Sequence, residues 1–184
     1  MDIESAIISR RSIRKFKDTK VPQDLVDKLI EAVRLAPSAY NAQPTRLLIV
    51  EDEVTKKVLK ENNIFRQEFV YDAPLIIFCL ADPDLYPKER FEPVFSKAAE
   101  IGGEVGAVRD LSISAQNLVL MATGLGLGTC YIGIVNRDKT KEIFNLPQNY
   151  VLPFVIIAGF SDEEPKPLSR KEKSNFIIDK KTKF

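Results

Sequence analysis

The chain has 184 residues, a length that suits one domain with a hydrophobic core and is short for two independent ones. Its 27 basic and 26 acidic side chains nearly cancel, which excludes the strong global field of many nucleic-acid-binding and membrane-binding proteins. Histidine is absent, so catalytic arrangements and metal sites that depend on imidazole are excluded.

The two cysteines, Cys79 and Cys130, lie far apart in the sequence and within apolar stretches, so we expect buried, reduced thiols and no metal site. The chain begins without the basic flank and apolar segment of a signal peptide. Its longest apolar run, around residues 75–81, is too short to cross a bilayer. We therefore expect a cytoplasmic protein with no membrane partner.

Hydrophobic periodicity predicts the elements in the first half of the chain. Apolar residues at helical spacing over residues 3–7 predict a short helix that ends near Arg10. A second apolar stripe, over residues 25–33, predicts a helix that begins after Pro22 and ends before Pro37. The next predicted elements are a strand at residues 47–50, a helix at residues 54–61 and a strand at residues 75–78.

A long helix buried on nearly all sides is predicted at residues 105–125, because this stretch lacks proline and has almost no polar face. Such a helix is often found at a subunit interface. The remaining predicted elements are a strand at residues 129–135, a helix at residues 139–144 and a central strand at residues 151–160. The alternation of helices and strands indicates a mixed α/β arrangement in a single domain, residues 1–184.

The composition changes after residue 160. Residues 161–184 are charged and contain prolines, with one apolar island at residues 176–178. Because this segment can bury little surface alone, we expect an arm that packs on another surface, for which a partner subunit is a candidate. The basic stretch at residues 165–171, taken by itself, is typical of a solvated tail.

The arginine segment, residues 10–14, is the first candidate for a binding site. Three guanidiniums and the Ser12 hydroxyl lie within five positions and can bind one phosphate through charge-assisted hydrogen bonds. Two alternatives are a solvated basic end of a helix and a nucleic-acid site, which the near-neutral overall charge disfavours. If the protein is an enzyme, we expect a bound phosphorylated cofactor to carry the chemistry, since histidine is absent.

The proline loop, residues 36–44, is the second candidate and has a proline near each end that restricts its conformation. Its Ser38, Asn41 and Gln43 supply neutral donors and acceptors that suit the edge of a polar heterocycle. The alternative is a helix-ending turn in which Ser38 and Asn41 bond to the backbone of the loop itself.

The glycine segment, residues 124–133, follows the long predicted helix and precedes a strand. Dinucleotide-binding loops require strand, glycines and then helix, so this order disfavours a Rossmann-type site. We expect these glycines to let the backbone approach a flat ligand or a neighbouring strand, with Gly133 exposing its amide to a ring.

Together, these segments resemble the nitroreductase family of FMN-dependent oxidoreductases. The matching stretches are Arg-Arg-Ser-Ile-Arg-Lys-Phe at residues 10–16, Ala-Pro-Ser-Ala-Tyr-Asn-Ala-Gln-Pro at residues 36–44 and Gly-Leu-Gly-Thr-Cys-Tyr-Ile-Gly at residues 126–133. The resemblance extends over residues 3–170 and implies an α+β fold with a central mixed β-sheet flanked by helices. It further implies an intertwined homodimer that binds two FMN molecules between its subunits, with residues 161–184 as an arm on the partner subunit.

The resemblance also implies which residues contact the FMN. Residues of one subunit would hold the phosphate, the ribityl chain and the pyrimidine edge or lie against the ring: Arg10, Arg11, Ser12, Arg14, Ile132, Gly133 and Arg170. The other subunit would contribute Pro37, Ser38 and Asn41. Arg14 is the candidate for the flavin O2/N1 region, where a cation stabilises the negative charge of the reduced ring.

The activity that the resemblance implies is electron transfer from NADH or NADPH to a small electron-poor acceptor, such as a nitroaromatic or a quinone. The cycle would be ping-pong, with flavin N5 as the reacting centre and no catalytic side chain. Two alternatives stay open: a flavin store or sensor without significant turnover, and a specialised reductive dehalogenase or enone reductase of the same family. No nucleic-acid partner is expected.

Overall fold

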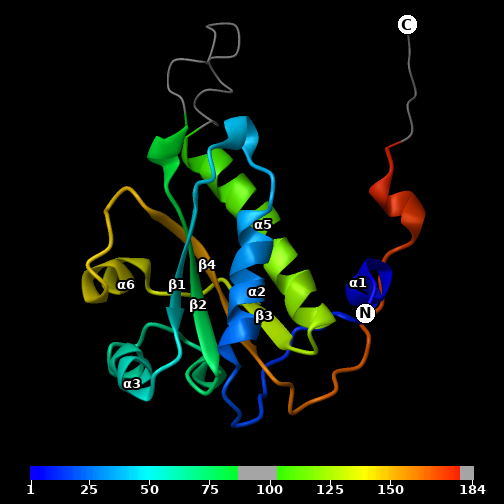
Figure 1. Cartoon of the computed structure of the whole chain (residues 1–184), viewed down its shortest axis with the longest axis horizontal. Helices are drawn as coiled ribbons and strands as arrows, with labels where there is room; N and C mark the ends of the chain where they lie inside the picture. Colours follow the sequence, from blue (N-terminus) through cyan, green and yellow to red (C-terminus); the bar gives the residue numbers. More distant parts are fainter. Residues whose placement is uncertain (87–102, 179–184) are drawn as a thin grey trace, which may run out of the picture.

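A four-stranded sheet forms the centre of the computed structural model, which describes residues 1–86 and 103–178 (Figure 1). Its strands are β1 (Thr45–Val50), β2 (Leu75–Ala81), β3 (Gly128–Ile132) and β4 (Val151–Gly159). They lie in the order β1-β2-β4-β3, so that β2 and β4 occupy the middle of the sheet. The apolar sequence of β2 suits this position, because each of its residues is buried.

The strand pairs of this sheet are all antiparallel, in place of the mixed sheet that we expected. Val50, the last residue of β1, lies opposite Ile76 near the start of β2. The connection between these strands therefore stays at one end of the sheet and does not cross its face, as a parallel pair would require. Among the described residues, parallel pairing occurs as an isolated bridge between Ser12 and Thr129. The α+β class is confirmed.

Helices are present at every position where the sequence predicts one, with ends that differ by a few residues. They are α1 (Ile3–Ser9), α2 (Gln23–Arg34), α3 (Glu53–Glu61), α5 (Glu104–Gly124) and α6 (Arg137–Ile143). Three of them begin directly after a capping side chain, Asp2, Asp52 or Asn136, which accepts a hydrogen bond from a backbone N–H of the first turn. Such caps satisfy N–H groups that have no partner within the helix.

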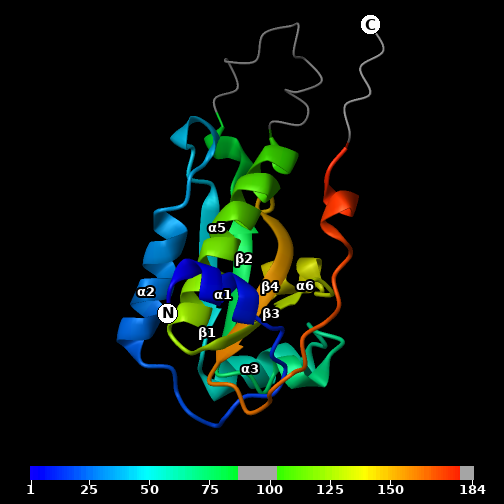
Figure 2. The ribbon, with the colours of Figure 1, turned by 90° about the vertical axis from the view of Figure 1, so that its right-hand side faces the viewer.

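Two layers of core lie on the two faces of the sheet (Figures 1 and 2). Ile77 and Cys79 of β2 point to the layer formed with α2 and α5, whereas Ile76 and Phe78 point to the layer that includes residues of α3. This alternation follows from the two-residue period of a strand. Cys79 lies in the first layer and Cys130 in the second, and both are free and buried, as predicted.

The long helix α5 packs against α2 and the sheet but is not buried on all sides in this chain (Figure 2). It leaves Val105, Ile113 and Met121 exposed to solvent. The expectation of nearly complete burial is therefore met on the sheet side alone. No helix in the described part of the chain is long and apolar enough to cross a membrane.

The segment after β4 leaves the body of the molecule. From residue 166 to residue 178 every described residue is exposed, and Figures 1 and 2 show this arm running beside the domain without lying on it. Its apolar island is open to solvent, with Phe176 73% exposed and Ile178 95% exposed. The arm therefore has an apolar surface that its own chain does not cover.

Candidate functional site

The arginine segment lies along the edge of the sheet, next to β3. After the end of α1, the backbone N–H of Ile13 donates to the Thr129 carbonyl at 2.9 Å. Ile13 is buried against Gly128, where a Cβ would come within 2.6 Å of the Ile13 side chain. Gly128 thus leaves room for the Ile13 side chain beside β3.

A carboxylate from the chain after β4 also binds the backbone of the arginine segment. Glu163, which follows β4, accepts hydrogen bonds from the backbone N–H groups of Arg14 and Lys15. The Lys15 ammonium also forms an ion pair with Asp162 at 2.9 Å. The hydrogen bond and charge of Lys15 lower the pKa of the Asp162 carboxyl. The chain leaving β4 therefore fixes the backbone from which the arginines project.

A cavity of about 420 Å³ opens beside the arginine segment. Its polar lining consists of Arg10, Arg11, Ser12, Arg14, Lys166 and Arg170. No Asp or Glu lines it, and none of its arginines forms an ion pair within the described residues. Although Glu163 accepts from the backbone N–H of Arg14, no carboxylate among the described residues lines the cavity or pairs with its guanidiniums, so the cavity suits a phosphate or another polyanion. The structure thus brings Arg170 to the segment 156 positions before it.

The arginines of the cavity differ in the hydrogen bonds that their guanidiniums make within the protein. The Arg11 guanidinium donates to the carbonyl oxygens of Ile8 and Arg10 at 2.8 and 2.7 Å. It therefore also complements the carbonyl end of α1, as the alternative interpretation predicts. Within the described residues, the Arg14 guanidinium donates to the Ser12 carbonyl at a long 3.4 Å, and it is therefore largely available to a ligand.

Strand β3 continues from the arginine segment toward Ile132 and Gly133. Its Cys130 lies beside Ser12 and Arg14: burial raises the pKa of this thiol, while the charge of Arg14 and a hydrogen bond with Ser12 act in the opposite direction. Ile132 is buried at the end of the strand and Gly133 is exposed after it. The structure thus places Ile132 on the strand that carries the arginine segment at its edge, and Gly133 directly after that strand.

The proline loop adopts a backbone that ordinary residues rarely take. Tyr40, Asn41 and Gln43 have φ angles of 55°, 54° and 48°, in the left-handed region. This conformation costs roughly 1–2 kcal/mol for a residue with a Cβ, although asparagine tolerates it better than most. The loop partly bonds to itself, because the Gln43 N–H donates to the Ser38 hydroxyl at 2.9 Å. The alternative interpretation of this loop is therefore correct for Ser38 in this chain.

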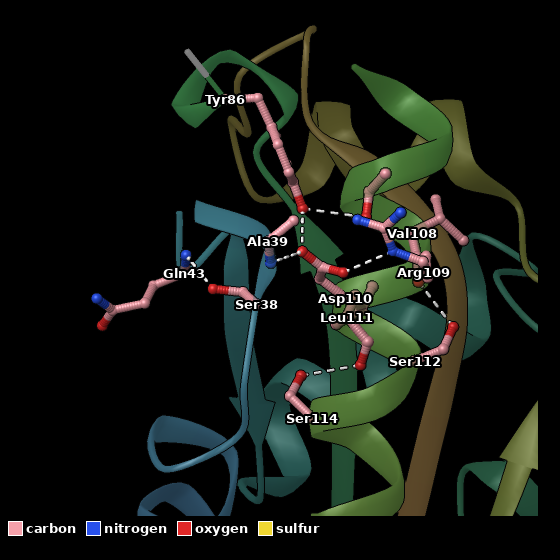
Figure 3. A network of polar contacts seen from close by, with 11 residues as sticks. Ser38, Ala39, Gln43, Tyr86, Val108, Arg109, Asp110, Leu111, Ser112 and Ser114 are labelled. Atoms are coloured by element: carbon pink, nitrogen blue, oxygen red, sulfur yellow. Dashed lines mark hydrogen bonds and ion pairs between the residues drawn. The ribbon is translucent and has the colours of Figure 1, made fainter. Parts of the chain in front are cut away.

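A buried carboxylate on α5 anchors this loop (Figure 3). Asp110 is 3% exposed and accepts hydrogen bonds from the Ala39 N–H at 2.7 Å, the Tyr86 hydroxyl at 2.6 Å and Arg109 Nε at 2.8 Å. Burial acts to raise the pKa of Asp110, but the hydrogen bonds from these three partners outweigh it and hold the pKa below its ordinary value. Burial and the neighbouring Asp110 carboxylate raise the pKa of Tyr86.

The structure does not bring the proline loop to the arginine segment within one chain. Pro37 and Ser38 line a second cavity, of about 350 Å³, which shares no lining residue with the first. Asp110 beside the loop and Thr123, which lines a cavity with Arg10, are 13 residues apart on α5. At a helical rise of 1.5 Å per residue, this separation is about 20 Å. Asn41 lines neither cavity.

Comparison with known families decides the assignment. The model of the nitroreductase family matches residues 7–64 and 56–160. The chain belongs to the nitroreductase family. One relative in this family, from Bacillus subtilis, is named as an NAD(P)H-dependent FMN reductase and is 35% identical over 174 residues, which cover 90% of this chain and 68% of the relative. Another, a protein of Thermus thermophilus named NADH dehydrogenase, is 28% identical over 189 residues, which cover 92% of each chain.

Solved structures of the nitroreductase family share the fold. A nitroreductase family protein of Clostridium difficile has a TM-score of 0.80 and 26% identity, over 99% of both chains. A structure from Desulfovibrio desulfuricans in complex with FMN also has a TM-score of 0.80, at 22% identity, and covers 97% of this chain and 96% of that one. At that identity, the second likeness shows the fold alone.

Two residues that shape this nitroreductase site escaped the sequence analysis. Asp110 carries a signal in hindsight, because it is the single carboxylate in residues 105–125, which the sequence predicts to form a buried helix. Glu163 carries none, since in a charged segment nothing distinguishes a carboxylate that accepts backbone hydrogen bonds from one that faces water.

Proposed function

We propose that this nitroreductase is an NAD(P)H-dependent flavin oxidoreductase that binds FMN at the arginine segment. The observation that carries the proposal is the cavity in which Arg10, Arg11, Arg14 and Arg170 meet without a carboxylate. A phosphate monoester with two negative charges fits such a cluster, because guanidiniums bind phosphate through paired hydrogen bonds. Membership of the nitroreductase family supports FMN as the phosphorylated ligand.

The residues present divide into contacts for each part of FMN. Arg10, Arg11, Ser12 and Arg170 would hold the phosphate and the start of the ribityl chain. Arg14 would lie at the O2/N1 side of the ring, and Ile132 and Gly133 would lie against the ring. The position of β3 beside the arginine segment supports this division, because one ligand can follow the strand from the cationic cavity toward Gly133.

A second copy of the chain would complete the site by contributing Pro37, Ser38 and Asn41. The separation of the proline loop from the arginine segment supports this, since the two line different cavities and the α5 residues beside them, Asp110 and Thr123, lie about 20 Å apart along the helix. Exposed apolar residues on α1, α5 and the arm also support a partner, among them Ile3, Ile7, Ile113 and Ile178. Exposed apolar side chains of this kind become buried when subunits associate.

Bound FMN would accept a hydride from NADH or NADPH at N5 and then reduce an electron-poor acceptor, such as a nitroaromatic or a quinone, in a ping-pong cycle. The protein would bind and orient the cofactor and stabilise charge. The Arg14 guanidinium would offset negative charge at the pyrimidine edge of the flavin. Tyr131, whose ring packs edge-on against Phe154 at 5.2 Å, directly precedes Ile132 and would bear on the choice of acceptor.

An absorption spectrum of the purified protein tests the proposal first. We expect a yellow protein, or a colourless one that becomes yellow with FMN, and bleaching by NADH or NADPH without oxygen. Steady-state oxidation of NAD(P)H with menadione or a nitrofuran then separates an enzyme from a flavin store. A preparation that takes up no FMN contradicts the binding site, and one that holds FMN without turnover contradicts the enzyme.

A further inference from the structure

We propose that Asp110 is a positioning residue of the flavin site: from the second turn of α5 it holds the proline loop in the form that presents Pro37, Ser38 and Asn41 to the FMN of the partner copy. This inference rests on the proposed function and deepens it. It assigns a role to a residue that is not among the proposed FMN contacts.

The proline loop needs an anchor because its conformation is not favourable by itself. Tyr40, Asn41 and Gln43 all have positive φ angles, which residues with a Cβ adopt only when their surroundings fix them. No α-helix or strand runs through the loop, which contains a single short turn at Ala39–Asn41. Without external contacts, these residues would return to more common backbone angles.

Among the described residues, hydrogen bonds to the chain after β2 and to α5 help to hold the loop. At its far end, the Asp82 N–H donates to the Pro44 carbonyl at 2.9 Å and ties the loop to the end of β2. In its middle, the Ala39 N–H donates to Asp110 Oδ2 at 2.7 Å, directly before the first left-handed residue. The carboxylate of Asp110 therefore joins the centre of the loop to the core of the protein.

Asp110 is itself held in one position. Tyr86 and Arg109 donate to its two oxygens at 2.6 and 2.8 Å, and the α5 backbone fixes its main chain (Figure 3). Packing of α5 alone does not require a carboxylate here, because burying a charge is unfavourable unless several hydrogen bonds compensate for it. A buried carboxylate aimed at a strained loop next to a ligand site is therefore best explained by the position that it gives to the loop.

The expected effect on FMN follows from the population of the binding-competent loop. If removal of the carboxylate lowers the fraction of competent loop to about a tenth, the apparent Kd rises about tenfold even though every FMN contact is still present. The flavin would also sit in a less ordered environment, so its visible circular dichroism would change.

The test measures the Kd of FMN, by quenching of flavin fluorescence, and the visible circular dichroism of the flavin in the full-length protein. Asp110→Ala removes the acceptor, and Asp110→Asn keeps an oxygen that the Ala39 N–H can reach. Asn117→Ala is the matched control, because Asn117 Nδ2 donates to the Ala32 carbonyl at 3.4 Å and so ties α5 to α2 without contacting the loop. Urea unfolding of each variant gives its stability.

We expect Asp110→Ala to raise the Kd of FMN about tenfold and to alter the visible circular dichroism of the flavin. In Asp110→Asn, the Kd should lie within about threefold of the wild-type value. In Asn117→Ala, the Kd should differ from the wild-type value by less than about twofold. If Asp110→Ala does not fold, Tyr86→Phe replaces it, since it removes one donor that orients the carboxylate, and a Kd rise of about twofold to fourfold is expected. A Kd unchanged in the folded Asp110 or Tyr86 variant, or raised equally in Asn117→Ala, overturns the inference. A wild-type protein without FMN binding overturns the proposed function instead.

Discussion

The arginine segment and the proline loop are both coil-rich, yet the protein holds them in opposite ways. The arginine segment is fixed through its backbone, by Thr129 of β3 and by Glu163, and its guanidiniums project into a cavity without carboxylates. The proline loop has a strained backbone, and its Ser38 hydroxyl and Ala39 N–H are engaged within the protein. The first region thus leaves the Arg14 guanidinium largely open to a ligand, whereas the contacts of the second maintain its backbone conformation.

This difference predicts that side-chain changes in the arginine segment alter ligand binding with little effect on stability. Arg14→Ala should weaken FMN binding by roughly 1.5–3 kcal/mol, because a charged hydrogen bond is lost, while the urea midpoint stays near that of the wild type. Fluorescence titration with FMN measures the change. Lys20→Ala is the matched control, since Lys20 pairs with Glu51 at the surface, outside the cavity. Equal FMN affinity in Arg14→Ala and the wild type would remove Arg14 from the site.

A backbone contact of the arginine segment should instead control stability. Gly128→Ala places a Cβ against Ile13 and should lower the free energy of unfolding by about 1–3 kcal/mol, as expected for overpacking. Gly124→Ala is the control, because no heavy atom lies within 4 Å of its added Cβ. Urea unfolding of both variants gives the comparison, and equal stability would show that Ile13 can move away without loss.

The link between Glu163 and the arginine segment should have a smaller effect. Glu163→Gln weakens the hydrogen bonds from the Arg14 and Lys15 N–H groups, and we expect a loss of roughly 0.5–1 kcal/mol of stability at this exposed position. Glu164→Gln, at the next residue, is the control. If the two variants have the same urea midpoint, Glu163 does not hold the segment.

The smallest effect should be a pH dependence that arises at the proline loop. The folded-state pKa of Asp110 lies below its ordinary value of 3.8, so its stabilising contribution is present above that pH and is lost as the pH falls through the folded-state pKa. The difference in urea midpoint between the wild type and Asp110→Asn should therefore be constant from pH 7 to pH 5 and shrink below about pH 4. A difference that grows on acidification would contradict this sign.

Local patterns in the sequence predict much of this fold, and long-range contacts account for what they miss. The helix α5 follows from a stretch without proline, and the buried β2 from a continuous apolar run. The antiparallel direction of the strands depends on which end of the sheet each connection occupies, and no local pattern encodes this. The contact between Ala39 and Asp110 joins residues 71 positions apart, so it becomes visible only once α2 and α5 have packed together.

The same limit applies to the site. The arginine segment and the glycine segment are recognisable from residue type and spacing, and the structure brings Arg10 and Arg170 to one cavity. That Gly128 serves the approach of Ile13 could not be inferred, because the requirement lies in a partner 115 positions away. Charge and flexibility can be read locally, whereas the steric reason for a glycine depends on its neighbours in space.

The bridge between Ser12 and Thr129 has a consequence for solubility. β3 lies at the border of the sheet, where unpaired N–H and carbonyl groups would offer a template for strands of other molecules. Because the Ile13 N–H occupies the Thr129 carbonyl, part of that border is already paired within the chain. A variant in which residues 10–14 detached from β3 would therefore expose an unpaired strand edge. We expect such a variant to aggregate as well as to lose its ligand.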